Sequence, residues 1–173
     1  MTTQFTPKIK NTILETKAPR IFLSYASEDK EISLGIAKYL KETIGNRGVI
    51  ILHFDREYKK IGTPFNPFMD LINHSEIVIV ICSSNYKRKC SYMETGVGWE
   101  YNLIEKRYQY RSNEFLLVPF FIEGYQDAPF LLVGVQGPKF NNNDPINYEN
   151  SFQKIMNELV NDLLDYLYNN NLL

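Results

Sequence analysis

The sequence has few cysteines and histidines, and it has no long apolar run. Two cysteines and two histidines in 173 residues are too few for a disulfide framework or a structural zinc site. No apolar stretch approaches the length of a membrane span, and no charged-then-apolar leader opens the chain. These absences predict a protein of the reducing cytoplasm with no metal and no membrane partner.

The chain also lacks an excess of charge of either sign. Lys and Arg number 19, Asp and Glu number 20, and the net charge is −1. Such a balance provides no attractive field for a polyanion, so we expect no nucleic-acid partner. A hydrophobic share of 44% and a length of 173 residues suit one globular domain. We expect a polar N-terminal arm over residues 1–19 and a single folded domain over residues 20–173.

Short apolar runs alternate with segments of helical periodicity, which is typical of an α/β fold. The runs predict strands at Arg20–Tyr25, Val49–Phe54, Glu76–Cys82 and Phe115–Ile122, with a further short strand at Gly134–Phe140. The periodic segments predict a helix capped by Ser27, then helices at Phe65–Asn73, Ser91–Arg107 and Phe152–Leu167. We therefore expect a flavodoxin-like, doubly wound parallel sheet of about five strands with helices on both faces.

In such a sheet, ligands bind beyond the carboxyl ends of the strands. This edge would gather Ser24–Ala26, the loop that begins at Asp55, and Ser83–Asn85. No glycine-rich phosphate loop follows the first strand, and Gly96-Val97-Gly98 lies within a predicted helix, where close helix packing explains it better. A phosphate-receiver function is also excluded, because Cys82-Ser83-Ser84 stands where an acceptor Asp would be.

Several segments together, in this order, resemble the TIR (Toll/interleukin-1 receptor) domain family. They are Ile21–Asp29 (IFLSYASED) as its first box, Phe54-Asp55 with Gly62, Ser83–Tyr86 with Cys90 and Glu94, and Phe115–Phe121. Each segment is weak alone, and their order and spacing make the assignment specific. The run Glu94–Trp99 (ETGVGW) is most similar to prokaryotic members.

The resemblance implies cleavage of the bond between nicotinamide and ribose in NAD⁺, with NAD⁺ as the substrate and no cofactor. It assigns the catalytic role to Glu94 and substrate contacts to Ser24, Tyr25, Ala26, Asp55, Gly62, Phe65 and Ser84. Nicotinamide leaves as a neutral base from a positively charged ring, so no strong general acid is needed. One carboxylate beside the ribose can stabilise an oxocarbenium-like centre and hold a hydroxyl.

Family resemblance further implies an antiviral role in prokaryotic immunity, similar to Thoeris-like systems. The product would be ADP-ribose or a cyclic or modified ADP-ribose signal. It also implies homo-oligomers formed through TIR–TIR contacts, and contacts with other TIR, sensor or effector proteins. The loop Asp55–Pro64 is the segment expected to complete a neighbouring active site.

Two residues leave alternatives open. Ser91 and Glu94 have the spacing of a helix capping box, so Glu94 has a purely structural interpretation. Cys90 occupies a position where many active family members carry Trp, and Tyr86 or Tyr92 would have to supply an aromatic wall instead. This departure favours a non-catalytic TIR–TIR adaptor as the second hypothesis. A third is another nucleoside N-glycosyl enzyme, such as a deoxyribosyltransferase.

Overall fold

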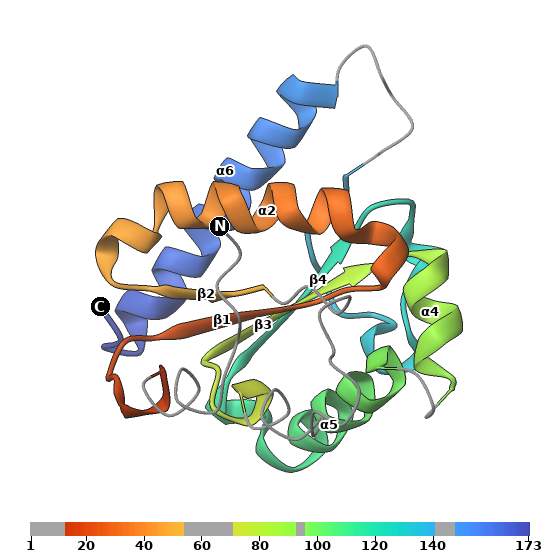
Figure 1. The fold of residues 1–173 in the computed structure, drawn as a ribbon, viewed down its shortest axis with the longest axis horizontal. Coiled ribbons are helices and arrows are strands. Elements are labelled where there is room, and N and C mark those ends of the chain that lie inside the picture. The colour runs from red at the N-terminus through yellow and green to blue at the C-terminus, as the bar shows by residue number, and fades with distance from the viewer. Residues whose placement is uncertain (1–12, 54–70, 93–95, 141–147) are drawn as a thin grey trace, which may run out of the picture.

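The computed structural model describes residues 13–53, 71–92, 96–140 and 148–173, and within them four parallel strands form one sheet (Figure 1). The strands are β1 (Arg20–Ser24), β2 (Ile50–Leu52), β3 (Ile77–Cys82) and β4 (Leu116–Phe121). Their order is β2-β1-β3-β4. The chain therefore reverses its direction of winding at β1, as in a flavodoxin-like sheet. The predicted α/β fold class is confirmed.

The fifth strand is reduced to a single bridge, so the predicted strand count is too high for the described residues. Lys139 pairs in parallel with Phe121, and the amide of Phe140 donates to the Phe121 carbonyl at 2.7 Å. The ladder stops there because Pro138 has no N–H to donate. At Gly137 the chain runs so close to β4 that a Cβ would collide with the carbonyl oxygen of Pro119.

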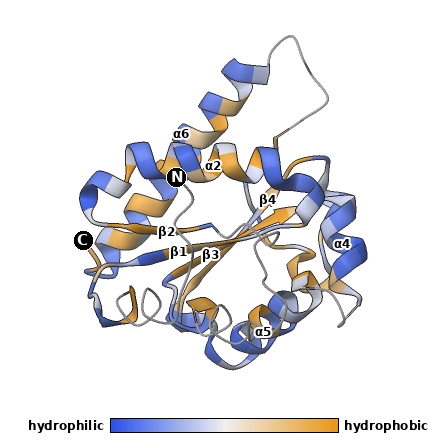
Figure 2. Cartoon of the chain, in the orientation of Figure 1, coloured by the Kyte–Doolittle hydropathy of each residue, from blue (hydrophilic) through white to orange (hydrophobic). Residues whose placement is uncertain are grey.

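Helices cover both faces of the sheet, and the strands are correspondingly apolar on both sides (Figures 1 and 2). Alternate strand residues such as Ile21 and Ile79 face the cluster that includes α2 (Lys30–Thr43) and α6 (Tyr148–Asn169). Their neighbours, such as Val78, face the cluster that includes α5 (Gly96–Arg111). Single turns of 3-10 helix lie at Ser27–Asp29, Gly45–Arg47, Ser112–Glu114, Tyr125–Asp127 and Phe130–Leu132.

The helix predicted at Ser91–Arg107 begins elsewhere, which is a correction. A separate helix, α4 (Ser84–Cys90), comes first, and Ser91 is its C-terminal cap residue. Ser83 caps α4, because its hydroxyl accepts a hydrogen bond from the Tyr86 amide at 3.0 Å. The other half of the proposed capping box, Glu94, lies outside the described residues. The α5 helix then starts at Gly96 and continues to Arg111.

The Ser27 cap is also a correction. Residues Ser27–Asp29 form a 3-10 turn, and α2 starts only at Lys30, without a side-chain cap. The Ser27 hydroxyl instead donates to the Glu28 carboxylate at 3.1 Å. The predicted stripe of Ile32, Ile36 and Leu40 is buried against the sheet, as expected for an amphipathic helix.

The described part of the predicted arm contacts the folded domain. Ile13 and Leu14 pack against the same apolar cluster as α5, and Thr16 accepts a hydrogen bond from the Arg20 side chain through its main-chain oxygen. The division at residue 19 remains a prediction. Across the described ranges, every helix is too short or too polar to cross a lipid bilayer.

Candidate functional site

The carboxyl ends of the four strands share one edge of the sheet, and α4 lies beyond it on the right of Figure 1. This edge brings together four of the predicted site residues. Ser24 ends β1, Tyr25 and Ala26 follow it directly, and Ser84 comes after β3. The catalytic candidate Glu94 and the substrate-contact candidates Asp55, Gly62 and Phe65 lie outside the described residues.

At the end of β1, the side chains of the predicted substrate residues face the interior. Tyr25 is 2% exposed, and its ring stacks on His53 with the centroids 4.8 Å apart and the planes parallel within 1°. His53 follows β2, and its Nε2 lies 3.0 Å from the hydroxyl of Ser33 on α2. Ala26 is fully buried, and its carbonyl accepts from the Asp29 amide at 2.9 Å. These contacts fix the backbone where β1 leaves the sheet.

At the end of β3, hydroxyl and carboxylate groups meet. The Ser83 hydroxyl donates to Asp29 Oδ2 at 2.5 Å, while the Ser84 amide donates to Glu123 Oε2 at 3.0 Å. Burial raises the pKa of Asp29, and the nearby Glu123 and Glu28 raise it further against the opposing hydrogen bond from Ser83. Asp29 therefore carries its negative charge at a cost, which is typical of functional edges and also occurs in structural networks.

Basic side chains on α4 flank these acids. Lys89 Nζ lies 2.5 Å from Glu28 Oε2, and Arg88 lies 3.4 Å from the other oxygen of the same carboxylate. The hydrogen bond from Lys89 lowers the pKa of Glu28. Lys87 donates to the main-chain oxygen of Gln126. The edge thus presents side chains of both signs of charge.

The positions that depart from the family pattern have distinct environments. Tyr86 is fully buried in the core, whereas Tyr92 is 59% exposed, so only Tyr92 offers an aromatic surface here. Cys90 is half-buried, and its thiol donates to the Lys87 carbonyl at 3.0 Å. Burial raises the pKa of Cys90, which disfavours the thiolate that nucleophilic catalysis would need.

Glu100 is a residue of this edge that the sequence interpretation missed. It is only 8% exposed, and its Oε2 accepts a hydrogen bond from Ser24 at 2.7 Å. A signal was present, because Glu100 follows Val97 by three residues and precedes Ile104 by four on the buried stripe of α5. An acid at such a position indicates a buried polar contact.

Comparison with known proteins agrees with the fold. A family model of the TIR domain matches residues 21–156. The chain belongs to the TIR domain family. No curated protein matches it.

Two solved structures share the fold of this TIR domain. One is the set of TIR domains of the activated Roq1 resistosome, which directly recognises the pathogen effector XopQ. It is 16% identical with a TM-score of 0.60, over 84% of this chain and 99% of that one. The other is a prokaryotic SEFIR domain, 23% identical with a TM-score of 0.55, over 81% of this chain and 91% of that one.

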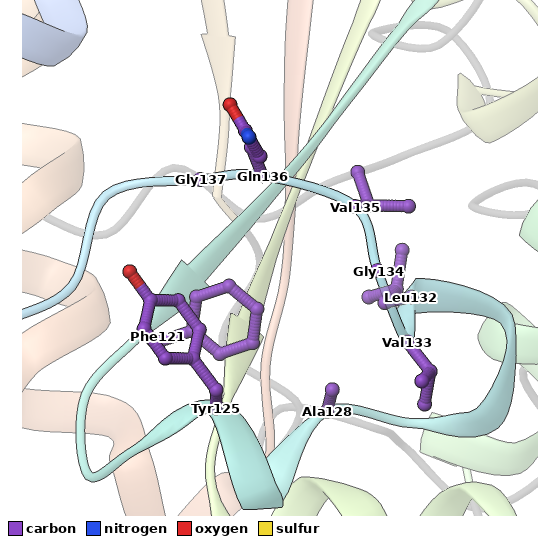
Figure 3. Close-up of a pocket in the computed structure, with 9 residues that line it drawn as sticks. All are labelled: Phe121, Tyr125, Ala128, Leu132, Val133, Gly134, Val135, Gln136 and Gly137. Carbon is purple, nitrogen blue, oxygen red and sulfur yellow. The ribbon is translucent and has the colours of Figure 1, made fainter.

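Beyond β4, the TIR domain has an open hollow of about 520 Å³ (Figure 3). Phe121 and Tyr125 form one wall, with ring centroids 4.8 Å apart in an edge-on arrangement. The segment from Leu132 to Gly137 forms the opposite wall, as Figure 3 shows. Of the predicted substrate residues, the four within the described ranges, Ser24, Tyr25, Ala26 and Ser84, do not line this hollow. In the described ranges, no three His, Cys, Asp or Glu side chains gather as metal ligands.

Proposed function

We propose that this TIR domain cleaves the nicotinamide–ribose bond of NAD⁺ and that Glu94 is the catalytic carboxylate. The observation that carries the proposal is the polar edge at the switch point of the sheet, between β1 and β3. Glu94 lies in the short connection between α4, which begins at this edge, and α5, which supplies Glu100 to it. Membership of the TIR family supports the assignment.

The chemistry fits a carboxylate-rich edge. As nicotinamide departs, positive charge develops on the ribose, and fixed negative charge nearby lowers the energy of that state. Glu94 would lie beside the ribose, with Asp29 and Glu123 adding to the field. Lys87 and Arg88 on α4 would balance the charge of the pyrophosphate. Water as acceptor gives ADP-ribose, and an internal nucleophile gives a cyclic product.

We further infer that the product is a signal in prokaryotic antiviral defence and that activity depends on TIR–TIR assembly. The activated Roq1 resistosome, whose TIR domains share this fold, supports the second inference. A neighbour's loop Asp55–Pro64 would complete the site. Specific activity is then expected to rise with protein concentration, because the active species is an oligomer.

The test is nicotinamide release from NAD⁺ over a wide range of protein concentration, with products separated by mass. We expect release with a specific activity that increases on assembly, and a product of linear or cyclic ADP-ribose mass. Full activity in a strictly monomeric sample would refute the assembly requirement. Cleavage of free nucleosides in preference to NAD⁺ would instead assign the chain to the deoxyribosyltransferase-like alternative.

A non-catalytic TIR–TIR adaptor is the second candidate, and one surface favours it. Phe130 is 89% exposed and Val133 is 69% exposed, beside the hollow beyond β4. Exposed apolar side chains next to a hollow are typical of protein contacts. Co-purification with another TIR protein, together with no NAD⁺ turnover even in the assembled state, would establish the adaptor.

A further inference from the structure

Three buried side chains from three different elements form a hydrogen-bond chain at the carboxyl end of β1. Ser24 Oγ donates to Glu100 Oε2 at 2.7 Å and lies 2.9 Å from the hydroxyl of Tyr86. Because a serine hydroxyl has one proton, the Tyr86 hydroxyl must donate to Ser24. The chain therefore runs from α4 through β1 to α5. Ser24 and Tyr86 are fully buried, and Glu100 is 8% exposed.

Apolar packing alone does not account for Glu100. Its neighbours on the buried stripe of α5 include Val97 and Ile104, and a leucine would fill the same space without removing a charge from water. Burying a carboxylate costs several kcal/mol unless hydrogen bonds offset it. A buried polar group of this kind fixes one arrangement of the elements that it joins, at the expense of stability.

The arrangement that it fixes is the exit of β1. Tyr25 and Ala26 follow Ser24 directly, and they stand where the sheet meets its candidate substrate. Ala26 in turn anchors the next turn, since its carbonyl accepts from the Asp29 amide at 2.9 Å. A small shift of Ser24 would therefore move both Ala26 and the acidic group of Asp29.

We propose that Glu100 is a positioning residue of the candidate site: through Ser24 and Tyr86, it locks the carboxyl end of β1 against α4 and α5. This inference deepens the proposed NAD⁺-cleaving function and rests on it for its kinetic consequence. Glu100 acts through the other two side chains, of which Ser24 is also a predicted substrate contact. The hydrogen-bond chain holds the backbone of Tyr25 and Ala26 where the nucleotide approaches.

The same strand provides a matched control at its other end. The Glu76 carboxylate accepts a hydrogen bond from the Arg20 amide at 2.6 Å, so a carboxylate holds each end of β1. The hydrogen-exchange rates of two backbone amides report on the two ends of β1. The Asp29 amide bonds to Ala26 after the carboxyl end, and the Ile50 amide bonds to Pro19 at 2.8 Å before the amino end.

The experiment compares Glu100→Leu, Glu100→Gln, Tyr86→Phe and Glu76→Leu by amide hydrogen exchange. We expect Glu100→Leu to speed exchange at Asp29 about tenfold, the effect of losing about 1.4 kcal/mol of local hydrogen bonding, with Ile50 unchanged. Glu100→Gln should retain protection within about threefold, because its amide oxygen still accepts from Ser24. Glu76→Leu should instead speed exchange at Ile50 and leave exchange at Asp29 unchanged. Tyr86→Phe should reproduce the Asp29 effect at smaller size.

Turnover provides the second readout. Glu100→Leu should raise the KM for NAD⁺ about tenfold and change kcat less than about threefold, because binding geometry is disturbed while Glu94 is kept. A purely structural role would speed exchange at Asp29 and Ile50 alike and leave KM unchanged, and that result would overturn the proposal. If the wild-type protein does not turn over NAD⁺, the proposed function fails. The positioning role of Glu100 is then still tested by whether Glu100→Leu speeds exchange at Asp29 more than at Ile50.

Discussion

At the amino edge of the sheet, two buried arginines donate to main-chain carbonyls, whereas at the carboxyl edge buried side chains bond to one another. Arg20 donates to the carbonyl of His74 at 2.8 Å, and Arg107 donates to that of Ile72. Ser24, Tyr86 and Glu100 instead satisfy each other. Side chain–side chain bonds are only about 10–15% of protein hydrogen bonds, so their concentration at one edge is informative.

The difference separates buried polar side chains that the backbone needs from buried polar side chains that need another explanation. At the amino edge, each arginine donates to a main-chain carbonyl just before β3, so its charge is used by the backbone itself. At the carboxyl edge, the bonds among Ser24, Tyr86 and Glu100 join side chains to side chains, so replacing both partners of such a bond by apolar groups removes the donor and the acceptor together. Their presence therefore calls for another reason, and the candidate site at that edge supplies one.

The largest stability effect is expected at the amino edge. Arg107→Met should lower the free energy of unfolding by about 2 kcal/mol, because the Ile72 carbonyl loses its charged donor and keeps only the Ser75 amide at 3.4 Å, and because the guanidinium no longer stacks over Phe115, 4.1 Å away. Chemical denaturation measures the loss, and the KM for NAD⁺ should not change. An altered KM with unchanged stability would break the comparison.

A smaller loss is expected for Ser83→Ala at the carboxyl edge. The variant removes both the α4 cap and the donor to Asp29, and the two together should cost about 1.5 kcal/mol. In the Asp29→Asn background, Ser83→Ala should cost less than it does in wild type, since the two side chains share one bond. Strict additivity in thermal unfolding would show that the bond between Ser83 and Asp29 contributes nothing.

Asp29→Asn should raise the stability of the folded protein, whereas the variants above lower it. Burial raises the pKa of Asp29, so the folded state holds this proton more tightly than the unfolded chain. Its stabilising contribution is therefore complete below the ordinary pKa of 3.8 and is lost as pH rises through the raised value. The variant should gain stability relative to wild type as pH increases, while its turnover falls. A stability difference that is constant with pH would contradict the raised pKa.

The smallest effect is expected on the solvated rim. Glu28→Gln breaks the exposed contacts with Lys89 and Arg88, and it should cost about 0.5 kcal/mol or less. Added salt should remove even this difference, because exposed ion pairs are screened. A loss comparable to that of Arg107→Met would mean that charge at the rim, and not only buried charge, determines the stability of this edge.

The sheet was predictable from the sequence because its strands are continuous apolar runs, which single out buried parallel strands. Glu76–Cys82 was predicted and Ile77–Cys82 is observed. The split between α4 and α5 was not predicted, because Ser83 and Ser91 are equally good cap residues and the spacing to Glu94 favoured the second. The burial of Tyr86 in the core favours a helix that begins directly after Ser83, and the core packing of Tyr86 is not visible in the sequence.

The candidate site was predictable only where it follows strand ends. Ser24, Tyr25, Ala26 and Ser84 lie on the common edge because parallel strands place their carboxyl ends together. Glu100 was missed because it comes from a helix, where contact with Ser24 depends on how α5 rotates against the sheet. The positions of Asp55, Gly62, Phe65 and Glu94 remain predictions, and so do the catalytic and substrate-binding roles of all the predicted site residues.

The most direct measurement is nicotinamide release by two carboxylate variants, Glu94→Gln and Glu76→Gln, assayed beside wild type at a concentration that permits assembly. Both variants remove one negative charge, and only the first does so in the segment joining α4 to α5. We predict that Glu94→Gln lowers turnover at least about a hundredfold with its unfolding midpoint unchanged, while Glu76→Gln stays within about threefold of wild type. Equal turnover by the two variants would contradict the assignment of catalysis to Glu94.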